Sequence, residues 1–179
     1  MGVCMNRKFR LLKAEEIELR VGTCTEEGFT LLLYKDARCD MNILDETVGA
    51  MNWKREHKRD NKNCVVSIYD EDKKEWVSKE DTGSESNTEA DKGLASDSFK
   101  RACVNWGIGR ELYTAPFIWV NADEKNGIHI DCKEYGGKKR YSPQVRDLDL
   151  KVAKITYNEN GEIENLAIFN KGKMVFCTR

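Results

Sequence analysis

Apolar side chains recur at helical spacing in one segment of the chain, between residues 95 and 106. The spacing i, i+4, i+7, i+8, i+11 marks one face of an α-helix and is occupied by Ala95, Phe99, Ala102, Cys103 and Trp106. We expect Thr88 to cap this helix, with Asp91 three residues later, and Gly107 to end it. The adjacent cations Lys100 and Arg101 lie on the far side. The pattern therefore predicts a sheet behind the apolar face and an anionic ligand in front of the cationic pair.

Alternating polar and apolar residues predict a β-hairpin near the start of the chain. Its strands cover Ile17–Val21 and Phe29–Tyr34, with the polar turn Thr25–Gly28 between them. A short helix follows, for which we expect Asp40 to be the N-cap. The apolar positions of this helix keep helical spacing at Met41, Leu44, Val48 and Met51.

Three further strand-like segments come next. They cover Trp53–Lys58, Asn63–Tyr69 and Glu75–Asp81, and the polar turns between them predict an antiparallel meander. The resulting order β-β-α-β-β-β-α is typical of an α+β domain. We predict an α+β fold in which the antiparallel hairpin and the three-stranded meander pack on one major helix, forming a β-β-β-α core.

The remaining third of the chain predicts a β-rich extension. Phe117–Val120 forms a short strand, residues 121–148 form a loop, and two strands then pair across Asn160-Gly161, a strong hairpin signal. These two strands cover Lys151–Tyr157 and Ile163–Phe169. We therefore expect a core domain over residues 11–115 and, over residues 116–179, an extension of the same body.

Composition sets the class of protein. The 179 residues are 40% hydrophobic and 34% charged, and no apolar run approaches the about 18 residues of a membrane span. With no recognisable secretory signal, we expect a cytoplasmic protein without a membrane partner. The seven cysteines are scattered, without a C-x-x-C pair, which favours buried thiols in a reducing compartment and no metal site.

The charge pattern leaves nucleic-acid binding open. The net charge is −1, but residues 54–62 hold five basic residues against two acids. Aromatic and basic residues interleave at Tyr34 with Lys35 and Arg38, at Trp53 with Lys54 and Arg55, and at Lys100-Arg101 near Trp106. Single-strand binders combine such cations with stacking rings. The alternative is that both tryptophans belong to the core, which we prefer for Trp106, and that residues 54–62 are a solvated hairpin.

Motifs for several chemistries are missing from the sequence. A phosphate-binding loop G-x-x-x-x-G-K-[ST] is absent, as are the G-x-S-x-G elbow and the H-E-x-x-H helix. The acidic clusters at residues 70–72 and 80–81 fit hairpin turns and strand ends better than a magnesium site. We therefore predict no catalytic residues, no cofactor and no ATP-driven activity.

The block S96-D-S-F-K-R-A-C-V-N-W-G107 resembles the signature helix of the Rad-fifty-two (Rad52) family of single-strand annealing proteins, particularly its phage members of the Sak type. The segments Y34-K-D-A-R38 and L44-D-E-T-V-G49, followed by Trp53, resemble that family's hairpin exit, helix and first meander strand. The similarity spans roughly residues 11–113 and does not extend beyond Pro116.

The resemblance implies rings or open helical oligomers that hold single-stranded DNA in a basic groove and anneal it without ATP. By position, Lys100, Arg101 and Arg38 match family residues that hold the DNA backbone. Eukaryotic members carry a further arginine where this chain has Val104, so its phosphate contacts must differ. The neighbouring cations Lys35, Lys54 and Arg55 complete the set of residues expected to bind DNA.

We therefore predict a phage-encoded, ATP-independent protein that anneals single-stranded DNA in homologous recombination and repair. The resemblance implies work in the cytoplasm of a bacterial host, with a phage exonuclease or a host single-strand-binding protein as candidate partners. One alternative is a protein that shields single strands without annealing them. Another is a structural or regulatory oligomer that does not bind DNA.

Overall fold

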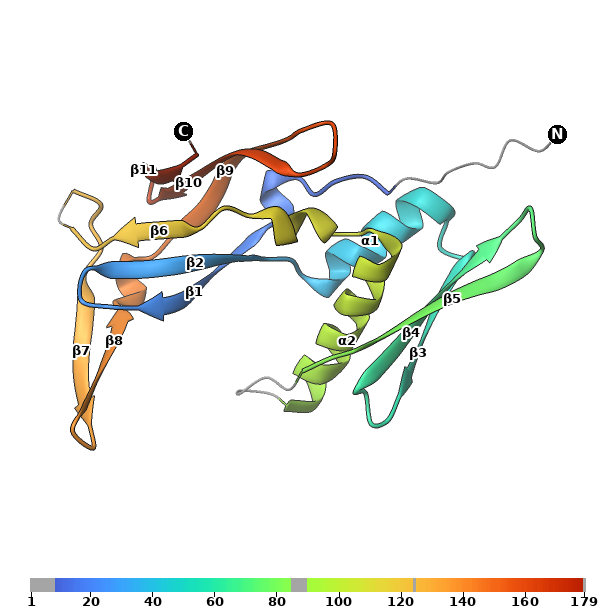
Figure 1. The fold of residues 1–179 in the computed structure, drawn as a ribbon, viewed down its shortest axis with the longest axis horizontal. Helices are drawn as coiled ribbons and strands as arrows, with labels where there is room; N and C mark the ends of the chain where they lie inside the picture. Colours follow the sequence, from blue (N-terminus) through green and yellow to red (C-terminus); the bar gives the residue numbers. More distant parts are fainter. Residues whose placement is uncertain (1–8, 85–89, 124, 179) are drawn as a thin grey trace. The chain divides into compact units, whose positions relative to one another are not determined.

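The structure is a computed structural model that describes residues 9–84, 90–123 and 125–178, without the side chains of residues 90–92. The chain forms two compact units (Figure 1). The first contains residues 36–110 and the described residues up to Leu11. The second contains residues 12–35 and the described residues from 111 onward. None of the described helices is long and apolar enough to cross a membrane.

The first unit is a meander packed against a helix. Its strands, in the order β3-β4-β5, are β3 (Trp53–Lys58), β4 (Asn63–Asp70) and β5 (Glu75–Thr82), all antiparallel. Helix α2 (Ala90–Trp106) packs on β4 and β5, and α1 (Ala37–Val48) packs on α2. The meander predicted from sequence is therefore confirmed, with each strand end within one residue.

Of the five residues predicted for the apolar face of α2, three lie in the core of this unit, while Ala95 and Trp106 are half-buried. Phe99, Ala102 and Cys103 are fully buried, and they meet the side of β4 that carries Cys64, Val66 and Ile68. Trp53 stacks on Phe99 with ring centroids 6.1 Å apart. Gly107 ends α2 with a φ of 101°, as predicted. The expected Thr88 cap lies outside the described residues.

Helix α1 begins earlier than predicted. Its N-cap is Asp36, whose carboxylate accepts a hydrogen bond from the Arg38 backbone N–H at 3.0 Å. The prediction of Asp40 as the cap was wrong, because Asp40 lies one turn inside the helix and is fully buried. Met51 was also wrongly placed in the apolar face. The helix ends at Val48, and Met51 is 89% exposed in the turn that follows.

The second unit consists of three small antiparallel sheets. The first has the order β1-β2-β6, the second β11-β10-β9, and the third is the hairpin β7-β8. Their bounds are β1 (Glu18–Cys24), β2 (Gly28–Tyr34), β6 (Ile118–Asn121), β7 (Ile130–Tyr135), β8 (Lys138–Pro143), β9 (Leu150–Tyr157), β10 (Ile163–Asn170) and β11 (Lys173–Cys177). Three short 3-10 helices accompany them: η1 (Ala14–Glu16), η2 (Arg110–Thr114) and η3 (Val145–Asp147).

The α+β class is confirmed, but its parts are grouped differently from the prediction. The first hairpin is β1-β2 as expected, yet β2 pairs with β6 from beyond Pro116, with Gly28 opposite Asn121. The expected loop 121–148 was wrong, because it contains β7 and β8, and β11 was not predicted. The division at residue 115 stays a prediction, although the first hairpin belongs to the same unit as the C-terminal strands.

Polar contacts also join distant segments of the second unit. The buried Glu111 carboxylate accepts a hydrogen bond from the Leu12 backbone N–H at 2.7 Å. The Tyr157 hydroxyl donates to the Leu12 carbonyl at 2.8 Å. Burial, reinforced by the nearby carboxylates of Glu111 and Glu16, raises the pKa of Tyr157. The phenol therefore stays a hydrogen-bond donor at any physiological pH.

Candidate nucleic-acid interface

The predicted cationic pair lies on α2, beside the residues that this helix buries. Lys100 is half-buried and Arg101 is exposed, next to the fully buried Phe99 and Ala102. Successive residues of a helix point about 100° apart, so the two cations leave the helix in different directions. Both lie outside the apolar core and are accessible to a ligand.

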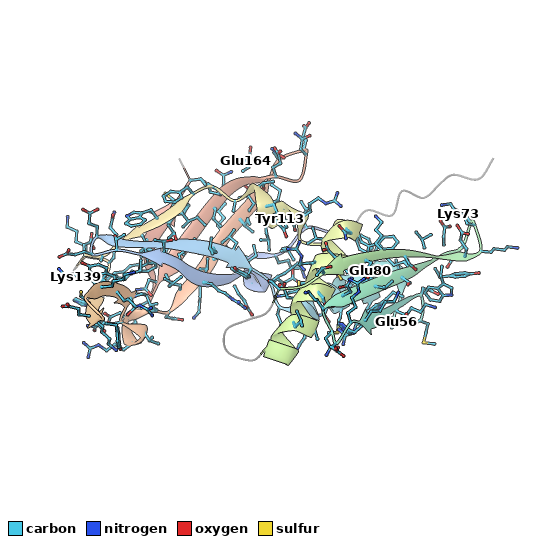
Figure 2. All side chains as sticks on the ribbon, turned by 60° about the horizontal axis from the view of Figure 1, so that its bottom comes forward. Glu56, Lys73, Glu80, Tyr113, Lys139 and Glu164 are labelled. Carbon is cyan, nitrogen blue, oxygen red and sulfur yellow. The ribbon has the colours of Figure 1, made fainter. Side chains whose placement is uncertain are left out.

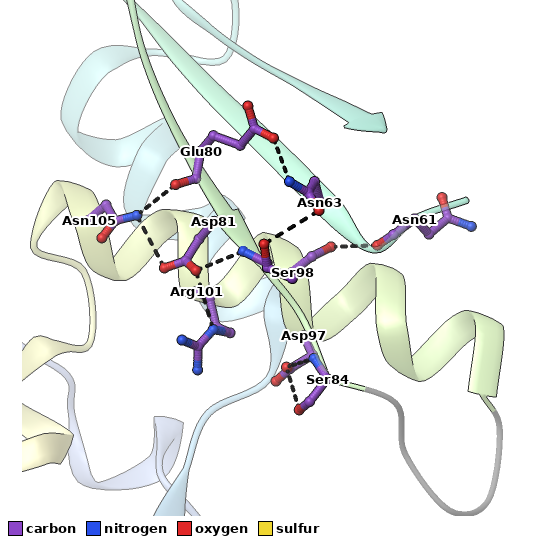
Figure 3. A network of polar contacts seen from close by, with 10 residues as sticks. Asn61, Asn63, Glu80, Asp81, Ser84, Asp97, Ser98, Arg101 and Asn105 are labelled. Carbon is purple, nitrogen blue, oxygen red and sulfur yellow. Dashed lines mark hydrogen bonds and ion pairs between the residues drawn. The ribbon is translucent and has the colours of Figure 1, made fainter. Parts of the chain in front are cut away.

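Arg101 has a protein partner. Its guanidinium Nε lies 3.5 Å from a carboxylate oxygen of Asp81 at the end of β5, with 48% of the arginine side chain exposed (Figure 3). A half-exposed ion pair of this kind contributes about 0–1 kcal/mol to stability. The guanidinium therefore keeps free donors, and a phosphate has only a weak bond to displace.

Asn105 fixes α2 to β5 at the same place. Its side-chain amide donates to the Glu80 carbonyl at 3.1 Å and to the Asp81 carboxylate at 3.2 Å. In the middle of the helix, the Ser98 hydroxyl donates to the Asn61 carbonyl at 2.9 Å (Figure 3). Because the helix is held at both positions, the direction of Arg101 relative to the sheet is set by the fold.

Two further cations gather at the C-terminal end of α2. Lys79 Nζ donates to the Asn105 carbonyl at 2.8 Å and lies 4.5 Å from the centroid of the Trp106 ring. Arg110 donates to the Val104 carbonyl at 3.0 Å. Positive charge is favourable here because the last carbonyls of a helix lack intrahelical partners and carry the negative end of its dipole.

Lys79 was not among the residues predicted from the sequence, and the register of the meander explains its position. Lys79 lies opposite Val66, which lies opposite Arg55, so the three residues share the face that packs on α2. Arg55 places its guanidinium 4.7 Å from the centroid of the Phe99 ring. The two edge strands thus each contribute a cation that covers an aromatic ring of α2.

Lys54 and Arg55 were predicted together but point to opposite faces of the sheet, as neighbours on a strand must. Lys54 Nζ lies 4.3 Å from the centroid of the Trp76 ring, on the face away from α2. Trp76 is 41% exposed, and Tyr69 meets its edge. The same face carries the acids Glu56 and Glu80 (Figure 2), so it is of mixed charge.

The last two predicted residues differ in exposure. Arg38, in the first turn of α1, has 85% of its side chain exposed and lies 3.7 Å from the Asp36 carboxylate. Lys35 belongs to the second unit and is only 5% exposed. The DNA-binding role of all six residues stays a prediction. On exposure alone, Arg38, Lys100 and Arg101 remain good candidates and Lys35 does not.

Two side chains on the face of the meander that packs on α2, His57 and Cys64, have shifted pKa values. Burial first, and then the charge of Arg55, lower the pKa of His57, whose Nδ1 lies 3.5 Å from the Ser98 hydroxyl. Burial raises the pKa of the Cys64 thiol to about 11, partly opposed by Arg55. Both groups are therefore neutral at pH 7, and the charge on this face comes from lysine and arginine.

One family model of known proteins matches the chain, and it covers all of the first unit that the structure describes but only part of the second. A family model described as "Rad52/22 family double-strand break repair protein" matches residues 9–127, well over half of the chain. The matched segment runs from the first described residue through α2 and β6 and stops before β7. Searches of curated proteins and of solved structures found no significant match. Among the residues with described positions, no group of three or more His, Cys, Asp or Glu side chains could hold a metal ion.

Proposed function

Because this chain belongs to the Rad52/22 family of double-strand break repair proteins, we propose that it binds single-stranded DNA and anneals complementary strands without ATP. The observation that carries the proposal is the pair Lys100-Arg101, held on the surface of α2 within the matched segment. In this proposal the pair contacts phosphates, together with the exposed Arg38. The protein works in recombination and repair as a phage-encoded factor in the cytoplasm of a bacterial host.

Contacts to phosphates suit annealing better than contacts to bases do. Clustered cations lower the repulsion between two strands, while the base edges stay free for pairing. The ring of Trp106 supports this arrangement because its N–H donates to the Val66 carbonyl at 3.1 Å and Lys79 covers its face. A ring held in this way is not a stacking platform for bases, which would withdraw them from pairing.

The proposal includes assembly into a homo-oligomer, as a ring or a helix. In the described part of the chain, β3 and β5 are edge strands of the meander, without a further strand beside either. Exposed edges favour pairing with another chain unless something covers them. We expect light scattering to show a mass several times the 20.6 kDa of one chain. A monomer across micromolar concentrations would contradict assembly. A phage exonuclease or host single-strand-binding protein remains the proposed partner.

The test is an annealing assay with fluorescence-labelled complementary oligonucleotides at subsaturating protein. We expect faster annealing than in protein-free controls, unchanged by EDTA or by omission of ATP, and slower at high salt. The double variant K100Q/R101Q should bind single strands with a log–log salt slope smaller by about 1.4, since each lost phosphate contact removes about 0.7. The matched control is K73Q/K74Q, which removes two charges from the turn at the other end of β5.

Each outcome decides between the functions considered. Tight binding with slower annealing than in the control reaction would make this a shielding protein. Absence of single-strand binding would leave a structural or regulatory oligomer. Equal salt slopes for K100Q/R101Q and K73Q/K74Q would remove the α2 pair from the binding surface.

A further inference from the structure

The β7-β8 hairpin of the second unit gathers positive charge on one of its faces. In its register Lys133 lies opposite Arg140, and Tyr135 lies opposite Lys138. Residues directly opposite each other in an antiparallel pair share a face, so these four side chains lie together. All four are exposed, and the Arg140 guanidinium lies 6.0 Å from the centroid of the Tyr135 ring. We call these four residues the hairpin cation face.

The tip of the hairpin is open. Gly136 and Gly137 form its turn with φ values of 57° and 74°, which suit the type of two-residue turn that glycine favours. A side chain added at either glycine would meet no other atom within 4 Å. Tyr135 and Lys138 flank this turn, and Tyr135 is 61% exposed. The outermost part of the hairpin cation face is therefore accessible to a ligand.

The two faces of the hairpin differ in charge. On the other face, Glu134 lies opposite Lys139 (labelled in Figure 2), a pair of opposite charges that stabilises the strands. On the hairpin cation face, two like charges, Lys133 and Arg140, lie opposite each other, which is destabilising. An anionic ligand between the two cations would offset this repulsion.

The three cations of this face have no acidic partner within the described residues. No ion pair of Lys133, Lys138 or Arg140 occurs in that part of the chain. The same face of β7 carries an acid at Asp131, two residues further from the tip than Lys133. Its carboxylate accepts a hydrogen bond from the Gln144 side-chain amide at 2.7 Å. The three cations therefore keep their donors for an external anion.

We propose that the hairpin cation face is a second set of residues that binds single-stranded DNA, in addition to the α2 pair. Three cations around an exposed tyrosine provide both phosphate contacts and a stacking surface for a base. The tyrosine favours a single strand over a duplex, since the faces of paired bases are covered by their neighbours. The hairpin begins at Ile130, beyond the segment that matches the family model. The choice of ligand rests on the proposed function.

The dimensions of the hairpin cation face limit the number of phosphates that it can contact. Opposite residues lie about 5 Å apart, and successive pairs on one face lie roughly 7 Å apart along the strands. The face can thus contact a few phosphates at most. Loss of all three cations should reduce the slope of log affinity against log salt concentration by about 2, since each contact contributes about 0.7. If wild type and variant bind equally at 1 M salt, this difference corresponds to about 100-fold weaker binding by the variant at 0.1 M salt.

The experiment compares two triple variants of the full chain by fluorescence anisotropy with labelled oligothymidylate. The test variant is K133Q/K138Q/R140Q. The control variant K125Q/K151Q/K154Q removes the same charge from exposed positions of the second unit that lie outside the β7-β8 hairpin. A second measurement is photocrosslinking of an iodouracil oligonucleotide, which should label Tyr135 in wild-type protein and also in K100Q/R101Q.

The outcomes separate this site from the proposed function. A smaller slope for the test variant only, with crosslinking at Tyr135, supports the site. Equal slopes in both triple variants, or equal competition by a duplex or by anionic vesicles, would overturn it while leaving the proposed function intact. Crosslinking at Tyr135 with no effect of K100Q/R101Q on binding would instead overturn the role of the α2 pair.

Discussion

Asp81 is the acid paired with Arg101, the residue proposed to bind a phosphate. Its carboxylate lies 3.5 Å from the guanidinium and also accepts the amide of Asn105 at 3.2 Å. If Arg101 holds a phosphate, the substitution D81N should strengthen DNA binding, because it removes a negative charge beside the phosphate. The asparagine side-chain oxygen can still accept from Asn105, so the anchor between α2 and β5 is kept.

The size of the effect follows from distance. A phosphate bound about 3 Å beyond the guanidinium lies roughly 6 Å from Asp81, where two like charges repel by about 0.7 kcal/mol in water. Salt reduces this repulsion within a Debye length of about 8 Å, and partial burial increases it. Release of Arg101 from a pair worth about 0–1 kcal/mol acts in the same direction. We therefore expect a gain of about 0.5–1 kcal/mol, equal to roughly two- to fivefold tighter binding.

The assay is anisotropy titration of a labelled single strand at constant salt. The matched control is D72N, which makes the same charge change in the turn between β4 and β5. Asp72 precedes the first residue of β5, and Asp81 lies near its last, so about 20 Å of strand separates the two acids. This distance exceeds the Debye length, so the control substitution should not affect a phosphate at Arg101. Unchanged or weaker binding by folded D81N would refute the role of Arg101 as a phosphate ligand.

Two further predictions test the first unit itself. A Cβ at Gly83 would lie 2.6 Å from the backbone N of Ser98 and 2.9 Å from the carbonyl oxygen of Leu94. The substitution G83A should therefore lower the free energy of unfolding by about 1–3 kcal/mol, measured by urea denaturation. An unchanged denaturation midpoint would contradict this packing. The pKa of His57 is lowered in the folded state, so the unfolded chain binds a proton more readily, and stability should fall as pH decreases through about 6.5. NMR titration of the imidazole should show the lowered pKa, and H57Q should lose this part of the pH dependence; an ordinary pKa would contradict it.

The elements predicted well from sequence are those with a buried face and a local signal. Helix α2 shows the 3.6-residue period because Phe99, Ala102 and Cys103 all meet the sheet. The meander strands were placed correctly because polar turns bound each of them. The β7-β8 hairpin was missed because its strands are mostly exposed and lack apolar alternation. The available signal was Gly136-Gly137, a dipeptide typical of tight hairpins.

The candidate site was predicted only in part, for a related reason. Lys100 and Arg101 were predicted together because they are neighbours in the sequence. The same reasoning paired Lys54 with Arg55, but consecutive residues of a strand point to opposite faces, and these two contact different aromatic rings. The contacts that define the surroundings of α2 depend on strand register. Lys79 and Asp81 reach the helix only because β5 pairs with β4 in one particular alignment. Such pairing between strands is not visible in local periodicity.

A chain with a net charge of −1 attracts DNA weakly as a whole, so binding must depend on where its charges lie. On α2 the competing acid is Asp81, which holds Arg101 through a weak, half-exposed pair. On the β7-β8 hairpin, Glu134 lies on the face opposite to Lys133 and Arg140. In the proposed binding mode, each surface thus keeps a few cations for phosphates while acids elsewhere balance the total. Because each phosphate contact contributes about 0.7 to the log–log salt slope, a site with a few contacts should contribute a slope of only about 1–2, and loss of one site should lower the total slope by that site's own contribution.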